Sequence, residues 1–148
     1  MVHGSALNRG TPETPGVMVR KILLVVIVIE ALTFLTAALL HSGIEIPLIH
    51  EPKIIPAMIV EGSCGIFLAI SAYAIGMHKK RAWKTAIYAD IFSIAGVLLG
   101  IIALALGRGP TTELNYIYHR TILSVLMIML IILFTSRVKS ELNQPQGR

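Results

Sequence analysis

Residues 111–134 read TTELNYIYHRTILSVLMIMLIILF, a polar start followed by an apolar run. The first ten residues include a glutamate, an asparagine, a histidine and an arginine, whereas residues 121–134 carry no charge. Thr111 or Thr112 can cap the amino end of a helix, and Glu113 favours the first turn through the helix dipole. The stretch therefore predicts a membrane-spanning helix that concentrates polar side chains at one end.

The composition of the whole chain also indicates a membrane protein. The 148 residues are 55% hydrophobic and only 14% charged, and the mean hydropathy is +0.76. Soluble domains carry about 25% charged residues, so this chain cannot cover a water-facing surface in the usual way. The formal charge of +5 forms no basic stripe on a polar face. We therefore expect the lipid bilayer as its surroundings and no nucleic-acid partner.

Three further apolar runs have the length of a membrane span. About 20 helical residues, at about 1.5 Å each, cross the roughly 30 Å hydrocarbon core. We predict an all-α fold, a four-helix transmembrane bundle at residues 20–136, with spans at 22–40, 54–77, 86–106 and 116–135. Residues 1–19 are predicted to be a disordered tail, and residues 137–148 a second tail. A cleaved signal peptide is disfavoured because the first apolar run is too long.

The distribution of Lys and Arg predicts the orientation of the four spans. Ten of these residues fall on one side of the membrane: Arg9, Arg20, Lys21, Lys79, Lys80, Arg81, Lys84, Arg137, Lys139 and Arg148. The other side has three: Lys53, Arg108 and Arg120. Because basic residues accumulate on the cytoplasmic side, both termini are predicted to be cytoplasmic. The expected location is the cell (inner or plasma) membrane.

Three acidic residues, Glu30, Glu61 and Asp90, lie inside predicted spans. At the centre of a span each costs about 2.5–3.5 kcal/mol, so each is expected to have a partner or a function. One interpretation is structural: Arg120 pairs with Glu61, while Asp90 reaches one of the basic residues Lys84 and Arg81. The other is functional: the acids and the histidine of the fourth span form steps for a proton or a cation.

The fourth span begins with a candidate site. Asn115 and His119 are i, i+4 neighbours on one helix face, and Tyr118 is adjacent to them. His41 ends the first span at a similar depth, so His119 and His41 are candidate axial ligands of a b-type haem, with arginines available for its propionates. The simpler interpretation is that these histidines only form hydrogen bonds at the membrane surface. His50-Glu51 could join either histidine in a metal site.

Small residues on the third span predict a close helix contact. Gly96 and Gly100 form a GxxxG pair, a spacing that lets two helix backbones approach. The contact can lie inside the bundle, or it can join two copies of the chain as a homodimer. Gly62, Ser63 and Gly65 are expected to act similarly on the second span.

The sequence resembles a group of proteins without an established activity. GRGP at 107–110, LN at 114–115 and YHR at 118–120 are similar to a run in small, uncharacterised four-span membrane proteins of bacteria and archaea. The resemblance covers the last three spans and implies the four-span topology alone.

Three functions remain open at this point. The first is a ligand-binding or accessory membrane protein with a polar pocket near the outer face. The second is a small proton- or ion-coupled transporter that uses the intramembrane acids, and the third is a haem-binding redox or sensor protein. The chain contains no HExxH, GxSxG or phosphate-loop motif, so an enzyme is not favoured.

Overall fold

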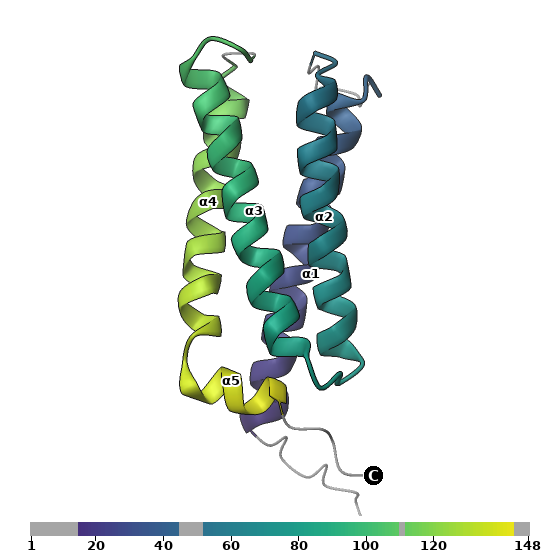
Figure 1. The fold of residues 1–148 in the computed structure, drawn as a ribbon, viewed down its shortest axis with the longest axis vertical. Helices are drawn as coiled ribbons and strands as arrows, with labels where there is room; N and C mark the ends of the chain where they lie inside the picture. The colour runs from purple at the N-terminus through teal and green to yellow at the C-terminus, as the bar shows by residue number, and fades with distance from the viewer. Residues whose placement is uncertain (1–14, 45–51, 110–111, 144–148) are drawn as a thin grey trace, which may run out of the picture.

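The computed structural model describes residues 15–44, 52–109 and 112–143, which form five helices (Figure 1). In chain order they are α1 (Pro15–His41), α2 (Ile55–Gly76), α3 (Ala82–Ala105), α4 (Glu113–Leu133) and α5 (Ser136–Asn143). The first four are long and apolar enough to cross a membrane. The predicted all-α bundle with four candidate membrane spans is confirmed at this level.

The bundle is built from consecutive antiparallel neighbours. α1 packs on α2, α2 on α3 and α3 on α4, whereas α1 and α4 make few direct contacts. Figure 1 shows the four long helices along the long axis and α5 lying across one end. We call this end the α5 end. The opposite end, where α1 and α3 finish and α2 and α4 begin, we call the open end.

α5 is the main departure from the predicted tail. Val138 and Leu142, one helical turn apart, are buried at 4% and 1% exposure. Arg20 of α1 donates to the backbone oxygen of Glu141 in α5 at 2.5 Å and to that of Ile75 in α2 at 3.3 Å. This side chain therefore links α5 to the first two helices. The indole of Trp83 donates to the Leu133 oxygen at the end of α4, at 2.8 Å. These contacts close the α5 end of the bundle.

The helix starts differ from the predicted boundaries by a few residues. α1 begins at Pro15, inside the predicted tail, because proline suits the first turn of a helix. α3 begins at Ala82, four residues before the predicted span. α4 begins after Thr112, whose side chain accepts from the Asn115 amide at 3.2 Å. Thr112 is therefore the amino cap, and Thr111 lies outside the described residues.

The GxxxG pair of α3 is used for packing within the chain. A Cβ on Gly96 would meet the Cys64 sulfur of α2 at 2.8 Å, and a Cβ on Gly100 would collide with the His119 ring of α4. Both glycines thus face neighbouring helices of the same bundle. The structure uses this face for contacts inside the bundle, and the homodimer through this pair stays a prediction.

Candidate functional site

A cavity of about 490 Å³ lies at the open end, and all four long helices contribute to its wall. Most of the lining is apolar, with Phe34, Val60 and Leu99 among its side chains. The polar part of the lining consists of His41, Glu61, Arg108, Asn115, Tyr118 and His119. The cavity therefore combines a large apolar volume with a compact polar wall, as ligand pockets commonly do.

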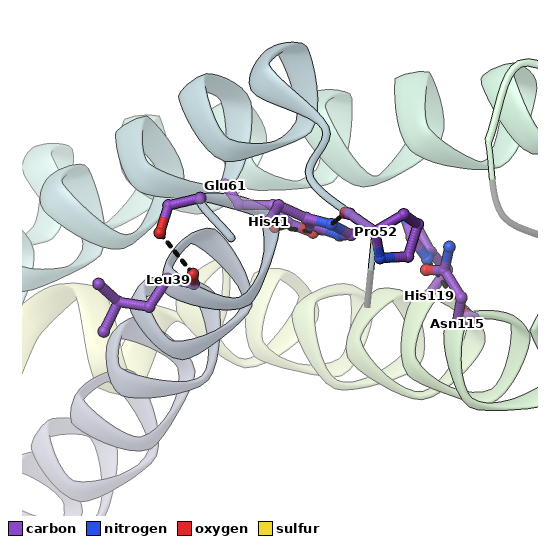
Figure 2. A network of polar contacts seen from close by, with 7 residues as sticks. Leu39, His41, Pro52, Glu61, Asn115 and His119 are labelled. Atoms are coloured by element: carbon purple, nitrogen blue, oxygen red, sulfur yellow. Dashed lines mark hydrogen bonds and ion pairs between the residues drawn. The ribbon is translucent and has the colours of Figure 1, made fainter. Parts of the chain in front are cut away.

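His41 and Glu61 form the part of this wall that joins α1 to α2. The Nε2 atom of His41 lies 3.7 Å from Oε2 of Glu61, and Nδ1 lies 3.4 Å from the Pro52 oxygen. Figure 2 shows His41 between these two partners. Both side chains are buried, each residue being 6% exposed. The pair thus places an imidazole and a carboxylate side by side at the cavity wall.

Asn115 and His119 form the part that belongs to α4. The Nδ1 atom of His119 lies 2.9 Å from the backbone oxygen of Asn115, so Nδ1 carries the hydrogen and donates it. Nε2 faces the backbone of α3 at Gly100. The ring is thus fixed by its own helix on one side and by a glycine on the other.

Tyr118 connects this wall with α2. Its ring packs edge-on against the His119 ring, with 5.1 Å between centroids and an interplanar angle of 81°. Its hydroxyl is buried and has no hydrogen-bond partner among residues 15–44, 52–109 and 112–143. The hydroxyl is also close enough to Glu61 and Cys64 to interact with them electrostatically.

Arg120 does not join these residues. Its side chain is exposed, and its guanidinium lies 5.5 Å from the centroid of the Tyr116 ring. Glu61 faces His41 instead. The predicted Arg120–Glu61 ion pair is therefore wrong. Successive residues on a helix point about 100° apart, so a helix that turns His119 inward turns Arg120 outward.

Glu30 and Asp90 form a separate polar site deeper in the bundle. Each is only 1% exposed, and none of their four carboxylate oxygens has a hydrogen-bond partner within the described part of the chain. The two groups, on α1 and α3, are close enough to interact electrostatically. The predicted contact of Asp90 with Lys84 or Arg81 is wrong. Asp90 lies on the inner face of α3, whereas both basic side chains are exposed.

Among residues 15–44, 52–109 and 112–143, the histidines do not form a metal centre with other residues. Where the structure describes the chain, no group of three His, Cys, Asp or Glu side chains could hold a metal ion. His50 and Glu51 lie outside the described residues. An iron on Nε2 of His119 would need the space that the Gly100 backbone occupies. This arrangement does not favour the haem hypothesis, which stays a prediction.

Comparison with known proteins adds no relative. No family model matches the sequence, and no curated protein or solved structure was found to be similar. The chain has the architecture of a multi-pass membrane protein. Its four membrane-length helices agree with a four-span topology, and no family is identified.

The apolar part of the cavity was missed by sequence reasoning. Gly96, Gly100 and Ala103 of α3 line it, as does Ala57 of α2. From these glycines the sequence predicts only a close contact between helices. A run of small residues that reaches one end of a bundle also leaves space there, and this was the signal that could have predicted the cavity.

Proposed function

We propose that this multi-pass membrane protein binds a small, largely apolar ligand in the cavity at the open end. The observation that carries the proposal is that four buried polar residues from three helices line one apolar space of about 490 Å³: His41, Glu61, Asn115 and His119. Buried polar side chains are costly in a bundle interior, so their placement around a shared space favours recognition over packing.

The side chains of the cavity wall indicate the chemical class of the ligand. The His41–Glu61 pair offers a site for a hydrogen-bonding or cationic group, and the Tyr118 hydroxyl offers a donor. The remaining lining suits aliphatic or aromatic groups. An amphiphilic molecule with one compact polar group fits this combination. The excess of basic residues at the α5 end favours a cytoplasmic position for that end, so the cavity would receive its ligand from outside.

Blocking the cavity tests this proposal. Ala57 lines the space and is half-buried, whereas Ile59 is two residues away on the same helix and 58% exposed. Small molecules extracted from purified wild type, Ala57→Trp and Ile59→Trp would be compared by mass spectrometry. We expect a compound in wild type and Ile59→Trp that is depleted in Ala57→Trp. Identical extracts from all three proteins would contradict ligand binding in the cavity.

Proton- or ion-coupled transport is a second candidate, supported by a different observation. Glu30 and Asp90 are buried together, and no basic side chain is paired with either of them in the described part of the chain. Buried acids without a base are a common element of proton relays. In proteoliposomes Glu30→Gln should abolish proton-driven flux, while the exposed Glu113→Gln should retain it. Absence of flux in wild type under every imposed gradient would remove this candidate.

A further inference from the structure

A second hollow lies on the other side of the bundle, between α1 and α4. It is an apolar groove of about 360 Å³ near the α5 end. Each helix contributes four apolar side chains at i, i+3, i+4 and i+7: Val19, Ile22, Leu23 and Val26 from α1, and Val125, Ile128, Met129 and Ile132 from α4. This spacing places them on one face of each helix, so two apolar stripes border a space that the helices leave between them.

The dimensions and lining of the groove suit a hydrocarbon chain. Seven residue steps along a helix are about 10 Å, which fits within one leaflet, since half of the hydrocarbon core is about 15 Å. An acyl chain lying there would contact aliphatic side chains of both helices. A helix from a second copy of the protein is the competing occupant, and the oligomeric state of wild type distinguishes the two.

A charged side chain marks one end of the groove. Arg137 belongs to its lining and is exposed, and no carboxylate among the described residues pairs with it. The same end of the molecule carries Lys80 and Arg81, also exposed. The groove is thus apolar along α1 and α4 and has a guanidinium just beyond the end of the α4 span, where a lipid headgroup would be expected. A guanidinium binds phosphate through paired hydrogen bonds.

We propose that this groove binds one acyl chain of an anionic phospholipid, with its phosphate held by Arg137. The chain fills the gap between α1 and α4 and so completes the bundle on the side where those helices barely touch. The site is separate from the cavity at the open end, and the proposal does not depend on the function assigned to that cavity.

Native mass spectrometry can test this proposal on the full-length protein. Wild type would be released from nanodiscs made of equal parts phosphatidylglycerol and phosphatidylcholine, and the bound lipids would be counted. We expect wild type to retain phosphatidylglycerol preferentially. Arg137→Gln should lower that preference about tenfold, because it removes the paired hydrogen bonds to the phosphate as well as the charge. Lys80→Gln removes only a charge at the same end, away from the groove, and should lower the preference by no more than about fivefold.

A second pair of variants tests the groove itself. Ile128→Trp places the larger ring in the groove lining, whereas Ile131→Trp places it on the same helix outside that lining. The two positions are a matched pair, because they are 59% and 65% exposed. Ile128→Trp should lose the retained lipid, and Ile131→Trp should keep it. Three results would overturn the proposal: equal retention of both lipids by wild type, an unchanged preference in Arg137→Gln, or a lipid-free wild-type dimer that Ile128→Trp dissociates.

Discussion

His119 illustrates how far a single side chain depends on the backbone opposite it. Its Nδ1 donates to the Asn115 oxygen at 2.9 Å, which fixes the ring orientation. Its Nε2 then points at Gly100, where any Cβ would collide with it. The position of the histidine at the cavity wall therefore requires a residue without a side chain on α3.

A double-mutant cycle tests this dependence. Gly100→Ala should gain about 1 kcal/mol of helix propensity but lose about 1–3 kcal/mol through overpacking against the ring. In a His119→Ala background the collision is gone, so Gly100→Ala should become stabilising. Thermal unfolding of wild type, both single variants and the double variant in detergent gives the coupling free energy between Gly100 and His119. Equal effects of Gly100→Ala in both backgrounds would contradict the close contact.

At the residue scale the sequence predicted polar candidates but not their pairing. Asn115, Tyr118, His119 and Glu61 stand out because polar groups are costly in apolar runs, and the structure brings all four to one cavity. The Arg120–Glu61 pair was predicted from depth alone. Depth follows from counting residues along a span, whereas the rotation of one helix relative to another depends on tertiary packing.

At the scale of elements, small residues decide how closely α1 approaches α2. A Cβ on Gly65 would meet the Leu35 side chain at 2.7 Å and the Ala31 backbone oxygen at 3.2 Å. On Gly62, one turn earlier on α2, the nearest atom would be the Ala38 methyl at 3.7 Å, an ordinary contact. An added Cβ would therefore collide at Gly65 but fit at Gly62.

Substitution by alanine should separate these two positions. Gly65→Ala is expected to destabilise the bundle by about 1–3 kcal/mol, because a backbone oxygen cannot move aside as a flexible side chain can. Gly62→Ala should be neutral or stabilise by up to about 1 kcal/mol through helix propensity. Unfolding by heat or by a denaturing detergent measures both. A larger loss for Gly62→Ala than for Gly65→Ala would contradict the observed helix register.

α5 was not predicted because its sequence signal is short. Eight residues, Ser136–Asn143, contain only two apolar side chains, Val138 and Leu142, and one i, i+4 pair does not distinguish a helix from a polar tail. The long spans were predictable because 20 apolar residues have few alternative structures. The helix is stabilised instead by tertiary contacts: the burial of Val138 and Leu142, and the hydrogen bond from Arg20 to the backbone oxygen of Glu141.

Removing this guanidinium should loosen α5 without unfolding the bundle. Hydrogen bonds to charged groups contribute about 1.5–3 kcal/mol, and less where they are partly exposed. For Arg20→Gln we expect amide hydrogen exchange in α5 to accelerate about 5- to 30-fold, corresponding to about 1–2 kcal/mol. Lys84→Gln, an exposed substitution at the same end, should leave the exchange rates of α5 unchanged. Similar protection of α5 in the two variants would show that Arg20 does not hold it.

At the scale of the whole molecule the bundle is asymmetric. α5, Arg20 and Trp83 close one end, whereas the cavity occupies the other. The buried pair Glu30 and Asp90 lies between the two ends. This polarity follows from features that the sequence presents separately, namely acids in the spans, small residues on α3 and a polar end segment. Only the packing of the helices shows that the closed end, the buried acids and the cavity follow one another along the long axis of the bundle.

Labelling from outside the cell would determine which end faces which side of the membrane. The single cysteine, Cys64, is fully buried, so it should not react with a maleimide added from outside. Because basic residues concentrate at the α5 end, a membrane-impermeant maleimide should label Arg108→Cys at the open end in intact cells. Lys80→Cys should react only after the membrane is disrupted. The reverse pattern would place the cavity on the cytoplasmic side, so its ligand would have to come from inside the cell.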